Sequence, residues 1–154
     1  MSLDPEALAS AAQVVEAQYL PSLQATFGRE WSPGIDQTPR FMVLHVLGSR
    51  MILNWGISAT KMNIPIRSFY IPMKRKWFIW NMSRLEVESD LYLGTLLHEL
   101  QHLSQWNMDA NEEVWMNEGL SQLAETMAGL DTVDPSAYLE QPRIRLDRWS
   151  NSAE

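Results

Sequence analysis

Residues 89–130 read SDLYLGTLLHELQHLSQWNMDANEEVWMNEGLSQLAETMAGL, and this stretch decides the fold. Ser89 is a good helix N-cap, and the residues after it have the apolar spacing of an amphipathic helix that runs to about Trp106. From Leu91 to Trp106 the only formally charged side chain is Glu99, so we expect this helix to be covered on several sides. Its apolar stripe consists of Leu93, Leu96, Leu97, Leu100 and Leu103.

His98 and His102 lie four residues apart on one face of this helix, nearly opposite the leucine stripe. With Glu99 between them they complete the HExxH pattern, His98-Glu99-Leu100-Gln101-His102. Two imidazoles one turn apart can both reach a single Zn²⁺ at about 2.0–2.1 Å, and the glutamate between them suits a general base for zinc-bound water. A core histidine would instead lie on or beside the stripe. We therefore predict that His98 and His102 bind zinc and that Glu99 is catalytic.

The third ligand is expected to be a carboxylate, because a catalytic zinc site needs three protein ligands and an open position. The chain has no cysteine, and His45 is the only other histidine. After a polar turn, a second helix is expected over residues 112–129, with Asn111 as its N-cap. If the two helices are antiparallel, Glu118 comes level with the second histidine of the motif. Glu118 is therefore the predicted third ligand.

Other carboxylates of this helical hairpin are alternatives to Glu118. Asp109, Glu112 and Glu113 would have to reach back from the turn. Glu125 is nearly two turns beyond Glu118, and we expect it to lie too far from the metal. The apolar stripe expected for the second helix consists of Met116, Leu120, Leu123, Met127 and Leu130.

The residues before the hairpin predict a helix and a small sheet. Asp4 as N-cap and Pro5 at the first helical position begin an N-terminal helix near residues 4–20, which Pro21 ends or kinks. Strands are expected at 40–47, 68–71 and 77–80.

Length and composition limit the class of protein. The chain has 154 residues, enough for one domain, and 45% of them are hydrophobic. The net charge of −7 disfavours a nucleic-acid or acidic-membrane partner. No apolar run reaches the roughly 18 residues of a membrane-spanning helix.

The stretch HELQHLSQW, followed by EEVWMNEGLSQLAE, resembles bacterial gluzincin metallopeptidases, in particular the hyicolysin-like and immune-inhibitor-A-like families. Those families carry a helix with HE(F/L)QH and a second helix with a W(L/M)NEGLS-type motif. The resemblance is specific over about residues 77–125 and looser to Trp149. It implies a Zn²⁺-dependent endopeptidase that is exported by a bacterium and cleaves a peptide or protein substrate. The implied site consists of the ligands His98, His102 and Glu118, the base Glu99 and the supporting residue Asn117.

The resemblance also implies an α+β, zincin-like fold. A small sheet from residues 40–82 would pack on the HExxH helix, and the helix at 112–129 would complete the cleft. We expect a single catalytic domain over residues 1–154, either in a minimal form or as a fragment of a longer protein. Residues 1–3 are typical of a start added for expression.

Two features depart from these families. Many gluzincins have an aspartate four residues after the ligand glutamate, where this chain has Gln122, which lacks the charge that raises ligand basicity. Related domains also continue to a Tyr or His that stabilises the oxyanion, whereas Tyr138 is the only Tyr after Glu118 and no His follows. The alternative hypotheses are therefore a non-catalytic zinc-binding module of this fold and a truncated catalytic domain.

Overall fold

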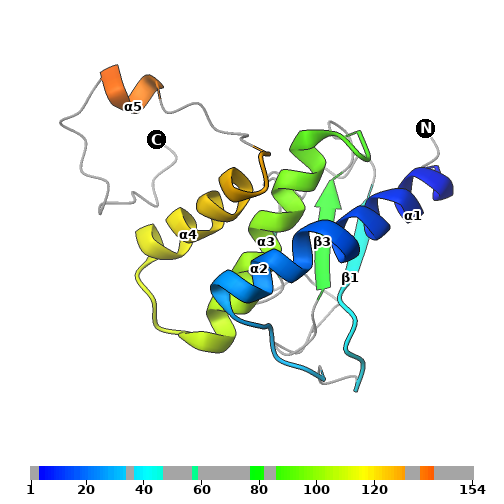
Figure 1. The fold of residues 1–154 in the computed structure, drawn as a ribbon, viewed down its shortest axis with the longest axis horizontal. Helices are drawn as coiled ribbons and strands as arrows, with labels where there is room; N and C mark the ends of the chain where they lie inside the picture. Colours follow the sequence, from blue (N-terminus) through cyan, green and yellow to red (C-terminus); the bar gives the residue numbers. More distant parts are fainter. Residues whose placement is uncertain are drawn as a thin grey trace, which may run out of the picture.

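The computed structural model describes residues 4–33, 37–46, 57–58, 77–81, 86–130 and 136–140. These residues are mostly helical, with a small sheet (Figure 1). The helical elements are α1 (Pro5–Val14), the π-helical segment η1 (Val15–Tyr19), α2 (Leu20–Phe27), α3 (Asp90–Met108), α4 (Val114–Met127) and α5 (Ser136–Glu140). The strands are β1 (Met42–Val46), β2 (Ile57–Ser58) and β3 (Trp77–Asn81). None of the described helices combines the length and the apolar character needed to cross a membrane.

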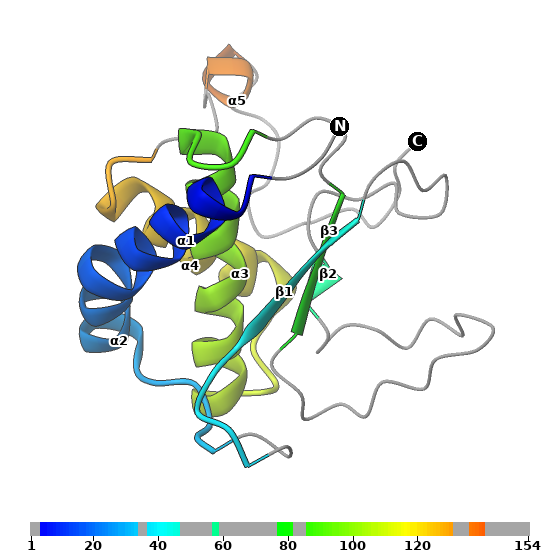
Figure 2. The ribbon, with the colours of Figure 1, turned by 90° about the vertical axis from the view of Figure 1, so that its right-hand side faces the viewer.

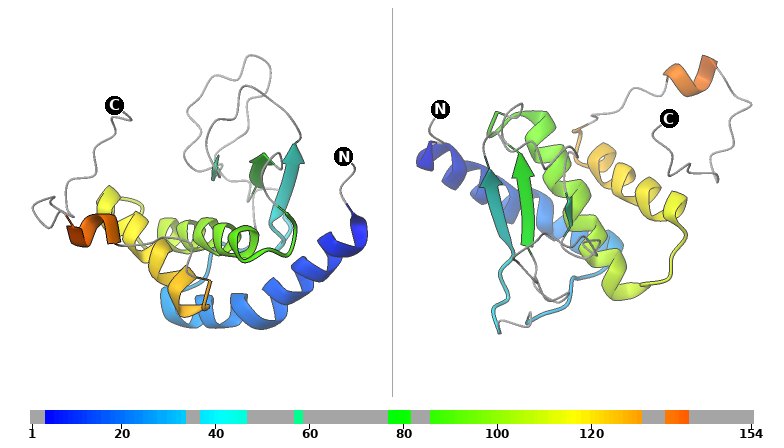
Figure 3. Two further views of the ribbon diagram at one scale, coloured as in Figure 1. Left: turned by 90° about the horizontal axis from the view of Figure 1, so that it is seen from above. Right: turned by 180° about the vertical axis from the view of Figure 1, so that it is seen from behind.

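Helix α3 lies between the sheet and the N-terminal helical segment, with α4 packed along it (Figures 2 and 3). All five leucines of the predicted stripe are buried, and Leu103 is only 1% exposed. The expectation that this helix is covered on several sides is therefore confirmed. Its lack of Lys and Arg follows from this position, because a charge pointing into either neighbouring layer would lose its hydration.

The sequence predicted where α3 begins but not where α4 begins. Ser89 is the N-cap of α3, and its Oγ accepts a hydrogen bond from the backbone N–H of Tyr92 at 3.2 Å. The prediction that Asn111 caps the second helix is wrong, because α4 begins at Val114 after Glu113. Asn111 remains in the turn, where its backbone N–H donates to Oδ1 of Asp109 at 2.9 Å.

The apolar stripe predicted for the second helix is buried only in part: Leu130, just after α4, is 5% exposed, and Met116 and Leu120 are half-buried. Leu123 and Met127 are 44% and 54% exposed, whereas Ser121, Ala124 and Glu125 are buried. Small and polar side chains of α4 thus face α3, because the surface of α3 that they meet carries histidines rather than leucines.

The sheet has the strand order β1-β3-β2, in which β1 pairs with β3 in parallel and β2 pairs with β3 in antiparallel. Strands β1 and β3 lie where the sequence predicted them, and the strand expected at 68–71 lies outside the described residues. The sheet meets α3 through β2. It is also joined to that helix by a hydrogen bond of 3.0 Å between Nε2 of His45 on β1 and the hydroxyl of Tyr92.

The N-terminal helix begins as predicted, because Oδ1 of Asp4 accepts from the backbone N–H of Glu6 at 2.9 Å. The chain stays helical past Pro21 with a change of helix type. The N–H of Leu20 donates to the carbonyl of Val15, five residues earlier, and Pro21 enters the first turn of α2, where its missing N–H costs little. Gly28, with φ +87°, ends α2.

Two leucines test which face of each helix carries the core. Leu103→Ala on α3 should lower the free energy of unfolding by about 2–5 kcal/mol, because it leaves a cavity in a closed layer. Leu123→Ala on α4 should cost about 1 kcal/mol or less, because that side chain is already 44% exposed. Urea unfolding of both variants measures the difference. Equal losses would contradict this assignment of the α4 faces.

Candidate metal centre

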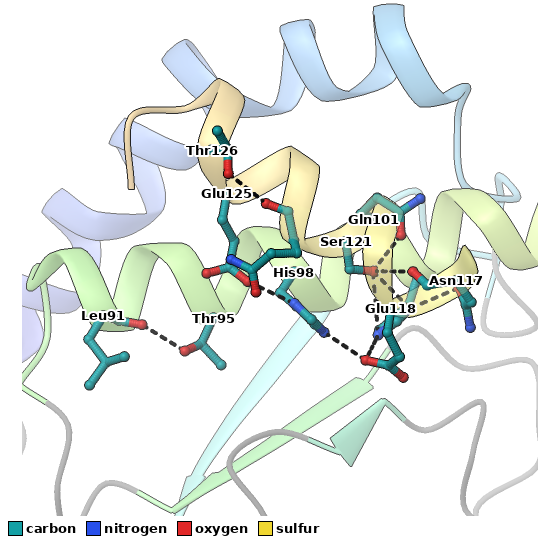
Figure 4. Close-up of polar contacts among 11 residues, drawn as sticks. Leu91, Thr95, His98, Gln101, Asn117, Glu118, Ser121, Glu125 and Thr126 are labelled. Carbon is teal, nitrogen blue, oxygen red and sulfur yellow. Dashed lines mark hydrogen bonds and ion pairs between the residues drawn. The ribbon is translucent and has the colours of Figure 1, made fainter. Parts of the chain in front are cut away.

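Two histidines of α3 and one glutamate of α4 meet between the two helices (Figure 4). Nε2 of His98 lies 3.3 Å from Oε2 of Glu118, and Nε2 of His102 lies 3.6 Å from the same oxygen. The two imidazole rings are perpendicular, at an interplanar angle of 83° with centroids 4.8 Å apart. One ligand atom from each of the three residues lies within 4.8 Å of the other two. The structure thus brings His98, His102 and Glu118 into one cluster.

The spacing of these atoms suits a metal ion. Tetrahedral bonds of about 2.0–2.1 Å place neighbouring ligand atoms about 3.3 Å apart. The separations of 3.3 and 3.6 Å from Glu118 to the two histidines are close to that value. Two imidazoles and one carboxylate are also donors that bind divalent transition metals. The cluster is therefore able to hold a metal ion through three protein ligands.

Glu125 holds the other nitrogen of His98. Nδ1 of His98 lies 2.8 Å from Oε1 of Glu125, whose side chain is only 4% exposed. A carboxylate can only accept, so Nδ1 donates to Glu125; Nε2, on the other side of the ring, lies 3.3 Å from Oε2 of Glu118. Glu125 is outside the cluster of ligand atoms, as expected from its height on α4, but the contact with His98 was not predicted.

A neutral hydrogen-bond network holds the other nitrogen of His102. Nδ1 of His102 lies 3.0 Å from Oδ1 of Asn117 and 3.0 Å from Oγ of Ser121. The Ser121 hydroxyl donates to Oε1 of Gln101 at 2.5 Å, so it can accept from His102 at the same time. The resemblance implied the supporting place of Asn117, whereas Ser121 and Gln101 were missed. The sequence signal for these two residues was an uncharged polar side chain in the middle of each helix, Gln101 in α3 and Ser121 in α4.

The surrounding carboxylates change the proton affinity of His98. Burial lowers the pKa of this imidazole, but hydrogen bonds to Glu118 and Glu125 and the charges of Glu99 and Glu125 outweigh it and raise the pKa to about 9. At neutral pH a proton therefore competes with a metal ion for Nε2 of His98.

The other predicted residues occupy different places. Glu99 is buried at 6% exposure on α3, next to His98 in the sequence. The alternative ligands of the turn, Asp109, Glu112 and Glu113, lie outside the cluster, which is the only such group that the described part of the chain contains. Tyr138 lies in α5, and its side chain is not among those that the structure describes.

Gln122 does not replace the aspartate that many gluzincins carry four residues after the ligand glutamate. Within the described residues no hydrogen bond joins its side chain to His98 or His102; its backbone carbonyl accepts from the hydroxyl of Thr126 at 3.2 Å. The carboxylate beside a histidine comes instead from Glu125, seven residues after Glu118.

Comparison with protein-family models, with curated proteins and with solved structures finds no match to this chain. The site itself defines only a broad class: proteins in which two histidines and one glutamate from neighbouring helices are able to hold a metal ion. The resemblance to gluzincins rests on the residues of the two motifs.

The raised pKa of His98 predicts how the free energy of unfolding of the metal-free protein depends on pH. A folded pKa of about 9 against an ordinary value of 6.5 means that the folded state binds more protons between these two values. The contribution of His98 to stability is therefore full below pH 6.5 and is lost as pH rises through about 9. Urea unfolding from pH 6 to 10 should show this decline.

The control for this pH dependence is His98→Gln, which keeps a polar side chain but cannot titrate. The variant should lose the part of the slope that His98 supplies, about one proton per molecule at most. The same slope in both proteins would contradict the assignment of the titrating group.

Proposed function

We propose that this chain is a zinc-dependent metallopeptidase of the gluzincin class with a zincin-like fold. In this proposal His98, His102 and Glu118 hold Zn²⁺, and Glu99 is the general base. The observation that carries the proposal is that Glu118 of α4 lies 3.3 and 3.6 Å from the Nε2 atoms of the two HExxH histidines of α3, which is close to tetrahedral ligand spacing. A structural zinc site has four closed protein ligands, whereas three ligands leave a position for a reactant.

The chemistry divides between the ion and Glu99. A zinc ion, when bound, supplies a Lewis acid that polarises the scissile carbonyl and makes water more acidic. Glu99 accepts a proton from the attacking water and returns it to the amine that leaves. With 6% exposure, this carboxylate is sheltered from bulk water. His98 and His102 keep their orientation because their Nδ1 atoms are held by Glu125 and by Asn117.

The proposed substrate is an extended peptide. Of the three described strands, β2 lies at one edge of the sheet, antiparallel to β3, against α3 and on the side nearer α4 (Figure 3). A peptide that adds to this edge by main-chain hydrogen bonds would run along the helix that carries the histidines. We also propose that the protein is exported by a bacterium, and this part of the proposal rests on the resemblance to gluzincins alone.

Metal content tests the ligands. Elemental analysis should give about one zinc per wild-type chain and much less for His102→Ala, because the remaining two ligands bind weakly. His45→Ala is the matched control, since His45 is a histidine of β1 that bonds to Tyr92 and lies outside the cluster. It should keep its zinc. Full retention of zinc by His102→Ala would contradict the ligand assignment.

Glu99→Gln separates an enzyme from a zinc-binding module. This near-isosteric change should leave zinc content intact and lower hydrolysis of an unstructured protein substrate by about 10²–10⁴-fold, because the general base is lost. Glu113→Gln, an exposed glutamate before α4, is the control and should cleave like the wild type. If wild type and Glu99→Gln both bind zinc and neither cleaves, the 154 residues are inactive, and the same assay on a chain extended past Glu154 separates a non-catalytic module from a truncated catalytic domain. Cleavage that survives chelation and the Glu99 change would contradict the proposed mechanism.

A further inference from the structure

The two histidines of the cluster are supported by groups of different charge. Nδ1 of His98 donates to the carboxylate of Glu125, whereas Nδ1 of His102 meets the neutral amide of Asn117 and the neutral hydroxyl of Ser121 (Figure 4). Glu125 is 3% exposed, so its charge acts on His98 with little screening by water.

The register of the two helices explains why Glu125 meets His98. Seven residues separate Glu118 from Glu125, so both lie on one face of α4, about 10.5 Å apart along its axis. Helices α3 and α4 run in opposite directions (Figure 1), so the later residue of α4 meets the earlier histidine of α3. Glu118 therefore faces the Nε2 atoms of both histidines, and Glu125 faces the opposite nitrogen of His98.

We propose that Glu125 is a positioning residue for the metal ligand His98. Its carboxylate accepts the Nδ1–H, which fixes the tautomer, turns Nε2 toward Glu118 and raises the basicity of that nitrogen as a ligand. This inference rests on the proposed metal centre and adds a residue that touches neither metal nor substrate. It also makes the two histidines unequal, with His98 the stronger donor.

The simpler explanation is that Glu125 only holds the two helices together. A carboxylate that is 3% exposed needs a partner for the fold alone, and the imidazole of His98 supplies one. The two explanations differ in what a change of Glu125 does to metal binding in a chain that remains folded. Metal affinity, and not stability, is therefore the quantity to measure.

The experiment is a competition for Zn²⁺ with a chromophoric chelator, together with the visible spectrum of the Co²⁺-loaded protein. Glu125→Gln keeps the shape of the side chain and an acceptor oxygen but loses the charge, and it should weaken zinc binding by about 10–100-fold. Glu125→Asp keeps the charge but is one methylene shorter. It should also weaken binding and shift the Co²⁺ bands, because the contact with Nδ1 is lost.

The matched control is Glu113→Gln, which removes the charge of an exposed glutamate just before α4 and outside the cluster. It should bind zinc like the wild type. If Glu113→Gln weakened zinc binding as much as Glu125→Gln, the loss of any nearby negative charge would explain the effect, and the positioning role would be overturned.

Two further outcomes overturn the inference, and they are distinguishable. If the wild type binds zinc and both Glu125 variants bind it equally well, the metal centre stands and the positioning role is wrong. If the wild type binds no zinc, the metal centre is wrong and the inference falls with it. Circular dichroism of each variant tests whether it is folded. If Glu125→Gln does not fold, the zinc affinity of Glu125→Asp tests the positioning role instead.

Discussion

The contact between α3 and α4 is polar, and the candidate site depends on it. An unpartnered polar group in a protein interior costs roughly 2–7 kcal/mol, so such an interface needs most of its groups to be paired. Among the described residues, Nε2 of Gln101 is the one buried side-chain atom without a hydrogen-bond partner. Here His98 lies between the carboxylates of Glu118 and Glu125, and His102 lies against Asn117 and Ser121. These pairings fix the rotation of both helices about their axes. The direction of the Nε2 atoms follows from that rotation.

The layers around α3 explain why the polar residues are gathered on one side. Leucines of α3 pack against the N-terminal helices, and the polar side chains of α3 lie on the side that faces α4. A helix held on several sides moves little, and a metal site requires ligands that keep their positions. The fold therefore packs α3 on several sides, and the α3–α4 interface supplies the residues that could bind a metal ion and the residues that hold them.

The sequence predicted α3 well, because its leucine spacing, its Ser89 cap and the HExxH motif all indicate the same helix. It failed for α4, where the exposed Leu123 and Met127 were expected to be buried. An apolar stripe predicts a buried face only when the surface it meets is apolar, and beside the two histidines the surface of α3 that α4 meets is polar.

The sequence also predicted which residues meet in the cluster, because helix geometry alone places Glu118 level with the motif. The support of the cluster was not predictable in the same way. Spacing along the second helix places Glu125 too far from a metal ion held by Glu118. It does not indicate that the Glu125 carboxylate contacts Nδ1 of His98, the nitrogen that faces away from Glu118. The links among Gln101, Ser121 and His102 depend on side-chain directions across two helices, which spacing along one helix does not determine.

We propose that the polar contact between α3 and α4 is a metal centre. The most direct test is a crystal structure of the zinc-loaded protein with anomalous diffraction data collected at the zinc absorption edge. We expect one strong anomalous peak between the two helices, about 2.0–2.2 Å from Nε2 of His98, Nε2 of His102 and a carboxylate oxygen of Glu118. The absence of a peak between these three residues would show that the polar contact is not a metal centre.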